Sequence, residues 1–126
     1  MSDNTREPQY QQLLELRDKK GLTPLGLMTN ATWRDDPRHF AWLFSRYKFV
    51  SKMLAGSSSV LEVGCADAFA TRIVLQEVGW LTAVDFDPIL VKDVNDRMDD
   101  EWEFDCRVHD ILEGPVKGAF DGVYAL

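Results

Sequence analysis

The sequence predicts an α/β fold in which a parallel sheet of about four strands follows a helical extension. From residue 59 onward, short apolar runs alternate with amphipathic segments. This β-α-β-α-β order is typical of parallel strands joined by right-handed crossovers. Earlier in the chain there are helix signals but no strand signal. We therefore expect a polar tail and helices in residues 1–56 and the sheet in residues 57–126.

The N-terminal part begins with a tail and a short helix. Residues 1–8 are polar, charged and without periodicity, so we expect them to be disordered. Leucines among charged residues predict a helix over 11–20, which Gly21 ends as a C-terminal cap. The Gly, Pro and Thr residues that follow predict a loop over 21–30.

A second helix is predicted to begin at Asp36 and Pro37. Aspartate caps a helix through its side-chain oxygen, and proline suits the first helical position because the N–H it lacks has no partner there. From 40 to 54, apolar residues recur at helical spacing, and Gly56 ends the pattern. We expect this helix to pack on the sheet.

Strands and helices then alternate to the end of the chain. The predicted strands are short apolar or alternating runs at 60–63, 81–84, 102–108 and 120–126. The predicted helices are 67–78, capped by Asp67, and 87–98, capped by Asp87 with proline at its first position. A last apolar strand at the sheet edge would expose unpaired backbone groups. We therefore expect either a C-terminally truncated piece of a longer protein, which we favour, or an oligomer that covers the exposed edge.

The composition excludes several kinds of partner and location. A net charge of −7 argues against nucleic acid or an anionic membrane, because both need clustered Lys and Arg. The polar N-terminus is not a signal peptide, and no apolar run approaches the ~20 residues of a transmembrane helix. Cys65 and Cys106 are too few for a disulfide scaffold and lack metal-site spacing. We expect reduced thiols, no metal and a cytoplasmic protein.

The turn after the first strand has the features of a cofactor site. Ligands of open α/β sheets bind beyond the carboxyl ends of the strands. Small residues at Gly64, Ala66 and Ala68 let a ligand approach the backbone, and the next helix offers unpaired N–H donors. The sequence therefore predicts a ligand at this turn.

Two classes of cofactor use such a turn. A dinucleotide favours G-x-G-x-x-G, but the third of these positions is Phe69, a poor substitute where glycine permits close helix–strand packing. S-adenosylmethionine (SAM) has no phosphate, which relaxes this restriction. Its α-amino group suits an acidic residue such as Glu62, near the end of the strand. The turn therefore favours SAM.

Acidic residues also end the next two strands. Asp85, followed by Phe86, ends the second strand, where a carboxylate can accept both ribose hydroxyls. Asp110 follows the third strand, where it can accept from an adenine amino group while Ile111 packs on the ring. These positions predict the nucleotide half of the site.

In this order, Glu62-Val63-Gly64-Cys65, Val84-Asp85 and Asp110-Ile111 before a Phe-Asp-Gly strand resemble the motifs of class I SAM-dependent methyltransferases. The resemblance covers roughly residues 39–126. It implies a Rossmann-like sheet with about four of about seven strands present. The helix from His39 to Phe49 is similar to that of sugar- and polysaccharide-modifying members, in which an Arg or Tyr approaches the methionine carboxylate. The cofactor-binding residues so implied are Glu62, Gly64, Cys65, Ala66, Asp85, Phe86, Asp110, Ile111, Tyr47 and Arg46.

The sequence departs from the family at the turn, where Ala66 and Ala68 replace the second and third glycines of E/D-x-G-x-G-x-G. If these positions need positive φ, each alanine costs about 1 kcal/mol. Structural alternatives stay open for single residues: a tight turn for Gly64, a salt bridge for Glu62, and core packing for Tyr47.

The function expected from the resemblance is SAM-dependent methyl transfer to a small-molecule or carbohydrate acceptor, with this chain supplying the SAM-binding half. No residue stands out as a general base, so no catalytic residue is predicted. One alternative is a non-catalytic Rossmann-like binding module, which the short length and Ala66 and Ala68 favour. The other is an NAD-dependent oxidoreductase, which Phe69 disfavours.

Overall fold

The computed structural model describes residues 3–126. The elements, in chain order, are η1 (Pro8–Tyr10), α1 (Gln11–Lys20), α2 (Leu27–Asp35), α3 (Pro37–Met53), β1 (Ser59–Val63), α4 (Thr71–Leu75), β2 (Trp80–Asp85), α5 (Pro88–Asp96), β3 (Asp105–Val108) and β4 (Gly122–Tyr124). No helix in this described part is both long and apolar enough to cross a membrane.

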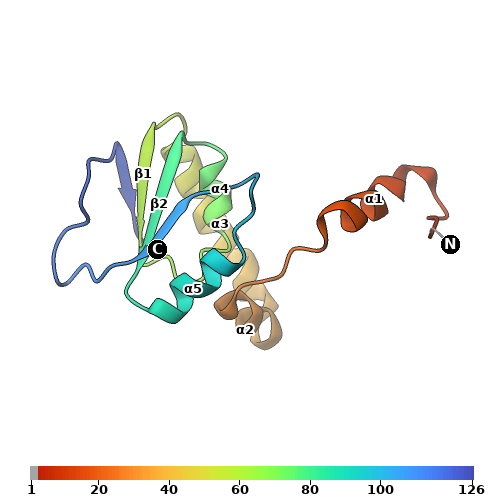
Figure 1. Ribbon diagram of the computed structural model, residues 1–126, viewed down its shortest axis with the longest axis horizontal. Helices are drawn as coiled ribbons and strands as arrows, with labels where there is room; N and C mark the ends of the chain where they lie inside the picture. The colour runs from red at the N-terminus through yellow and green to blue at the C-terminus, as the bar shows by residue number, and fades with distance from the viewer. Residues whose placement is uncertain (1–2) are drawn as a thin grey trace.

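The four strands form one sheet in the order β3-β2-β1-β4, and every neighbouring pair is parallel (Figure 1). The predicted α/β fold with a parallel sheet is confirmed. Strand β1 is central, so Glu62 lies opposite Ala83 of β2 on one side and Tyr124 of β4 on the other. This register decides which side chains meet at the site.

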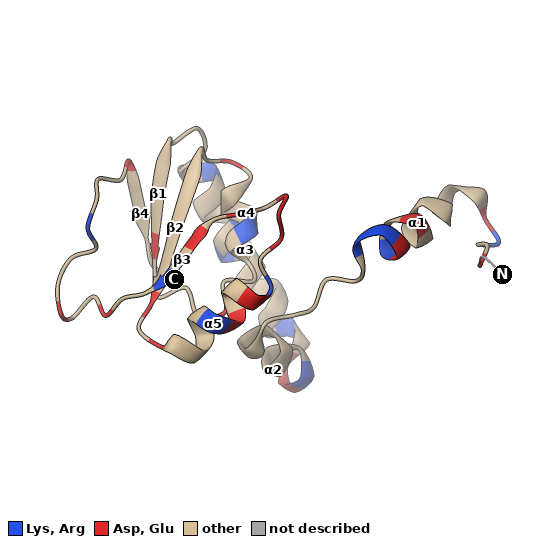
Figure 2. Cartoon of the chain, viewed as in Figure 1, with Lys and Arg blue, Asp and Glu red and all other residues tan. Residues whose placement is uncertain are grey.

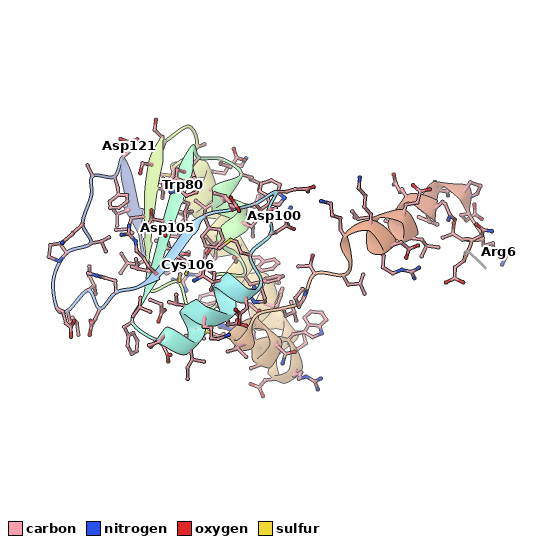
Figure 3. The ribbon with its side chains drawn as sticks, in the orientation of Figure 1. Arg6, Trp80, Asp100, Asp105, Cys106 and Asp121 are labelled. Atoms are coloured by element: carbon pink, nitrogen blue, oxygen red, sulfur yellow. The ribbon has the colours of Figure 1, made fainter. Side chains whose placement is uncertain are left out.

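The edge strand β4 is aligned by a side chain that precedes it. The Asp121 carboxylate accepts hydrogen bonds from the backbone N–H groups of Ser58 and Ser59, at 3.0 and 3.2 Å, where β1 begins (Figure 3). The backbone N–H of Asp121 donates in turn to the Ser59 carbonyl. These bonds fix the start of β4 against the start of β1.

The hydrophobic core lies between one face of the sheet and the helices α3, α4 and α5. It joins alternate residues of the strands, among them Val60, Leu81 and Ala83, to helix residues such as Val50 and Val74. Alternation along a strand puts every second side chain on the same face. The sheet face that these helices cover therefore also carries Glu62 and Tyr124.

The local helix signals are confirmed where the cap is close in sequence. Gly21 ends α1 with φ +79°, and its N–H donates to the Arg17 carbonyl. Asp36 caps α3 by accepting from Arg38, and Asp87 caps α5 by accepting from Ile89. Each of these side chains bonds to the backbone two residues further on, as the sequence patterns predict.

Two predictions about helices were wrong. Residues 27–35 form helix α2, and residues 27–30 of it fell in the predicted loop 21–30. Helix α4 spans only Thr71–Leu75 of the predicted 67–78, because the backbone from 64 to 70 is held in a turn. In the predicted tail 1–8, Met1 and Ser2 lie outside the described residues, and a 3-10 helix begins at Pro8.

Candidate functional site

The predicted site residues meet at the carboxyl edge of the sheet. Because β1, β2 and β3 are parallel and adjacent, Gly64, Asp85 and Asp110 follow the ends of neighbouring strands. The parallel ladder continues past β3, since the His109 N–H donates to the Asp85 carbonyl at 2.9 Å. The fold therefore brings the three sequence motifs together.

Asp85 holds the turn that follows β1. Its Oδ2 accepts from the Ala66 N–H at 2.8 Å, and its Oδ1 accepts from the Asp87 N–H at 3.0 Å. The Gly64 and Cys65 N–H groups both donate to the Val84 carbonyl. The carboxylate is buried, yet each oxygen can accept a second hydrogen bond. It can thus hold the turn and a ligand hydroxyl together.

The backbone of the turn is left-handed at the three positions where the family's motif has glycine. Gly64, Ala66 and Ala68 have φ of +74°, +51° and +51°. Both alanines therefore meet the condition, positive φ, under which the sequence assigned them a cost. A Cβ built on Gly64 would meet no atom within 4 Å, so there is open space beside the backbone here. A ligand can approach the turn at this residue.

Glu62 lies at the centre of a buried polar cluster. Its side chain points into the core and is only 1% exposed, and its Oε2 accepts from the Thr71 hydroxyl at 2.6 Å. Burial raises the pKa of this carboxyl to about 7, and the hydrogen bond from the Thr71 hydroxyl offsets part of the effect. Tyr47 and Tyr124 meet edge to face, with ring centroids 6.2 Å apart. Burial, followed by the Glu62 charge, raises the pKa of both phenols.

Two atoms of this cluster have no hydrogen-bond partner among the described residues: Oε1 of Glu62 and the hydroxyl of Tyr124. Buried polar atoms are nearly always paired, so an unpaired couple calls for a ligand or a water molecule. Tyr124 was not among the predicted site residues. The tyrosine lies opposite Glu62 in the parallel register of β4, which the sequence of a single strand does not reveal.

Asp67 joins the turn to helix α2. The prediction that it caps the helix after the turn was wrong, because its Oδ2 accepts from the Thr29 N–H and hydroxyl, at 2.7 and 3.0 Å. Its Oδ1 accepts from Phe69. Asp93 of α5 accepts from the Leu27 N–H in the same first turn of α2. Helix α2 is thus capped by two carboxylates that are distant in sequence, and it docks beside the turn.

Cys65 lies in the turn as a buried thiol. Its Sγ is 4.0 Å from that of Cys106 on β3, and both cysteines are free (Figure 3). The hydrogen bond with Cys106, together with burial, raises the pKa of the Cys65 thiol. A nucleophile needs the thiolate, so this environment favours a buried thiol of the turn over a nucleophile.

The remaining predicted residues lie around the edge and are more exposed. The Asp110 side chain accepts from the Leu112 N–H at 2.9 Å, which is a turn role. Ile111, which follows Asp110, and Phe86, which follows Asp85, are both exposed. On α3, Tyr47 is buried, whereas the Arg46 guanidinium lies 4.8 Å from the centre of the Trp42 ring. The structure therefore gives Arg46 a partner of its own.

A groove lies elsewhere on the molecule. It has a volume of about 730 Å³ and runs beside α4 and α5, and none of the predicted cofactor residues lines it. The cofactor edge is open instead, with exposed strand ends and loops. The groove therefore touches the end of the turn, at Ala68 and Phe69, but lies apart from the predicted cofactor residues.

Comparison with known proteins identifies the fold. No protein-family model matches the sequence, and no curated protein matches it. Among solved structures, the chain is similar to the N-methyltransferase NodS from Bradyrhizobium japonicum in complex with S-adenosyl-L-homocysteine. The identity is 26% over 72% of this chain and 47% of that chain, with a TM-score of 0.53.

Two further structures agree. The sugar N-methyltransferase KedS8 from a Streptoalloteichus species has 17% identity over 82% of this chain and 41% of that chain, with a TM-score of 0.59. A dimethyladenosine transferase from Plasmodium falciparum has 22% identity over 67% of this chain and 30% of that chain, with a TM-score of 0.55. The chain thus has the class I methyltransferase fold and spans less than half the length of each of these structures.

Proposed function

We propose that this chain binds SAM at the carboxyl edge of its sheet and supplies the cofactor-binding part of a methyltransferase. The observation that carries the proposal is the left-handed turn at Gly64, with open space beside it and with the Asp85 carboxylate bonded to its backbone. Acidic residues at the ends of the neighbouring strands extend the site. The methyltransferase fold of the solved structures supports this assignment.

The methionine end of SAM fits the buried cluster under α3. An ammonium group donates up to three hydrogen bonds and carries a positive charge. Oε1 of Glu62 and the Tyr124 hydroxyl are the two unpartnered acceptors of the cluster, and Glu62 supplies the opposite charge when it is ionised. We assign the α-amino group to these two atoms, with Tyr47 beside them.

The adenosine end fits the edge formed by β2 and β3. Asp85 has one acceptor site free on each oxygen after it has bonded to Ala66 and Asp87, which suits the two ribose hydroxyls. Phe86 and Ile111 offer exposed apolar surface for the adenine ring, and Asp110 offers an acceptor for its amino group. In this arrangement the backbone of Gly64 to Ala66 lies under the centre of the cofactor.

SAM, when bound, supplies an activated methyl group on a sulfonium. The residues described here would bind and orient that group, since placement for in-line attack is the main contribution of such a protein. An open α/β sheet binds its ligands at this edge. A small-molecule or carbohydrate acceptor is our proposal, and the structural likeness to a sugar N-methyltransferase supports it.

One observation weighs against a dinucleotide cofactor. The ring of Phe69, at the position of the third glycine of a dinucleotide motif, stacks on Phe44 of α3 with centroids 6.1 Å apart. A side chain that packs between helices here does not provide the close glycine contact that a pyrophosphate turn uses. A reduced, cytoplasmic protein and a division near residue 56 stay predictions.

Calorimetry with S-adenosylhomocysteine, adenosine and NAD tests the proposal. We expect Asp85→Ala to raise the dissociation constants of S-adenosylhomocysteine and adenosine by the same factor, at least about tenfold, because both ligands carry the ribose. The control is Asp87→Ala, which removes the cap of α5 two residues away and should leave both affinities within about twofold. Equal affinities of wild type and Asp85→Ala would refute the ribose assignment. NAD binding tighter than that of S-adenosylhomocysteine would favour an oxidoreductase.

A second variant separates the two ends of the cofactor. Glu62→Gln should raise the dissociation constant of S-adenosylhomocysteine about tenfold and leave that of adenosine unchanged, because adenosine lacks the α-amino group of the amino acid end. Loss of both affinities together would instead point to a collapsed turn. Failure of the folded wild-type chain to bind any of these ligands would support a non-catalytic module.

A further inference from the structure

Helix α1 is the part of the chain that has least contact with the body. It extends away from the sheet on a linker, as Figure 1 shows, and none of its residues is buried. Leu13 and Leu16 are 57% and 59% exposed. An isolated helix of about ten residues is marginal in water, and a helix in a protein is normally stabilised by packing of an apolar face. Within the described part of its own chain, helix α1 therefore has no apolar surface against which Leu13 and Leu16 pack.

The groove beside α4 and α5 offers a surface of this kind. Its volume is about 730 Å³. Several partly buried apolar side chains line it: Phe44, Phe69, Ile73, Met98, Trp102 and Phe104. Arg72 stacks over the Trp102 ring at 4.0 Å and closes one side. A cavity of this size accepts a few leucine side chains from one face of a helix.

One rim of the groove is acidic and the last turn of α1 is basic. Asp96, Asp99 and Asp100 line the groove, and Glu101 follows them. The basic residues of the lining already have partners: Lys20 contacts Glu101, Arg72 the Trp102 ring and Arg97 the Asp93 carboxylate. The last turn of α1 carries Arg17, Lys19 and Lys20. Figure 2 shows the acidic loop after α5 on the flank from which the arm departs, and the basic end of α1 next to the linker.

One contact of this kind already exists within the chain. Lys20 Nζ lies 2.6 Å from Glu101 Oε1 at the groove. Leu13, Leu16 and Lys20 are three and four residues apart, so they lie on one face of the helix. The helix face that carries Leu13 and Leu16 is therefore also the face on which Lys20 pairs with Glu101 at the rim of the groove.

The linker directs the arm of each chain away from its own groove. Leu22, Thr23 and Pro24 line the groove themselves, so the segment that leads to α1 already occupies part of its wall. The linker is fixed at Gly26, where a Cβ would lie 2.2 Å from Asp67 Oδ2, and at Leu27, whose N–H donates to Asp93. For α1 to enter the groove of its own chain, the backbone would have to reverse direction at Gly21.

We propose that the groove binds helix α1 of a second copy of this chain, in a two-fold dimer with exchanged arms. A two-fold axis lets each copy give its arm and receive that of its partner, so both grooves are filled by the same contact. This interface is distinct from the edge of β4 and does not depend on the proposed methyltransferase activity.

Sedimentation velocity of the full chain over a concentration series tests the proposal. We expect a concentration-dependent dimer. Leu13→Ser with Leu16→Ser should raise its dissociation constant more than about tenfold, because two apolar side chains per arm lose their burial. The matched control is Leu112→Ser, an exposed leucine of the loop before β4, which should leave the dimer unchanged. Circular dichroism checks that each variant is folded.

A charge exchange separates this interface from others. Asp99→Lys with Asp100→Lys should weaken the dimer, as should Arg17→Glu with Lys19→Glu, and the chain with all four substitutions should recover it. A dimer that survives the leucine and charge variants would overturn the proposal, since it would use another surface. A monomer at all concentrations would also overturn it, whether hydrogen exchange shows α1 protected in its own groove or unprotected.

Discussion

The turn after β1 and helix α1 are held in opposite ways. The turn is bonded to three distant parts of the chain. Asp85 accepts from the Ala66 N–H, Asp67 accepts from the Thr29 N–H, and Arg97 donates to the Asp67 carbonyl. Helix α1 has no buried residue, and its tie to the body is the ion pair of Lys20 with Glu101. One segment takes its shape from tertiary contacts and the other from its own sequence.

This difference explains why the turn tolerates two alanines in a left-handed backbone. A strained residue persists only where its surroundings hold it. At Ala66 the N–H is held by the Asp85 carboxylate, and at Ala68 the N–H donates to the Cys65 carbonyl while the methyl group packs in the core. A segment as exposed as α1 has no such contacts and contains no such residue.

The largest expected effect that tests this comparison concerns Glu62. In the folded chain its pKa is raised from 4.5 to about 7, so the folded state keeps a proton that the unfolded chain has already released. This contribution to the free energy of unfolding is complete below pH 4.5 and is lost as the pH rises through 7. The loss amounts to about 3 kcal/mol.

Urea unfolding of wild type and Glu62→Gln between about pH 5 and pH 8 measures this contribution. The wild type should lose stability relative to the variant as the pH rises, because glutamine does not ionise. Glu103→Gln, at an exposed position, is the control and should follow the wild type. Parallel curves for wild type and Glu62→Gln would show that the carboxyl is not buried in the folded chain.

The next effect concerns the link between the turn and α2. Asp67→Ala removes the acceptor of the Thr29 N–H and leaves a buried donor unpaired, so we expect a loss of about 2 kcal/mol in stability. Hydrogen exchange should increase over residues 27–35. Asp87→Ala, which removes the cap of the more exposed α5 terminus, should cost about 1 kcal/mol and leave α2 protected. Unchanged exchange in α2 would mean that Asp67 does not hold it.

A smaller effect of opposite sign is expected at the left-handed alanines. Ala66→Gly should stabilise the chain by about 1 kcal/mol, because glycine adopts positive φ without strain. Ala68→Gly should stabilise the chain by less, because the substitution removes a buried methyl group. The control is Ala70→Gly, at φ −80°, which should destabilise. Thermal unfolding measures all three variants, and destabilisation by Ala66→Gly would argue against the left-handed turn.

The smallest effect is expected in the arm. At a concentration at which the protein is monomeric, Leu16→Ser should change the free energy of unfolding by less than about 0.5 kcal/mol, because the side chain is already exposed. Urea unfolding at low protein concentration measures it. A loss comparable to that of Asp67→Ala would mean that α1 packs on the body of its own chain.

Much of the fold follows from short-range patterns. The caps at Asp36 and Asp87 lie two residues from the N–H groups that they bind, and the apolar strands β1 and β2 were predicted within one residue at each end. Within the candidate site, the glycine pattern identifies Ala66 and Ala68 as the positions to examine for positive φ, and both have it in the structure. Each of these features depends on residues that are neighbours in the chain.

Other features depend on which strands are neighbours. Helix α2 has one local cap, the Thr29 hydroxyl that accepts from the Gly26 N–H. The acceptors of its Thr29 and Leu27 N–H groups are Asp67 and Asp93, which lie far along the chain and gave no signal near residues 27–35. Tyr124 was missed because only the register of β4 places it beside Glu62. The approach of Cys65 to Cys106 likewise requires the order β3-β2-β1.

The sequence alone determined an α/β fold with parallel strands, the ends of its locally capped helices, and the positions of acidic residues at the carboxyl edge. The tertiary structure decided that Asp67 caps α2, that Glu62 is buried with two tyrosines, and that a groove forms beside α4 and α5. The physical reason is range. Backbone propensity and capping act over a few residues, whereas burial and buried hydrogen bonds join residues that meet only when the sheet has formed.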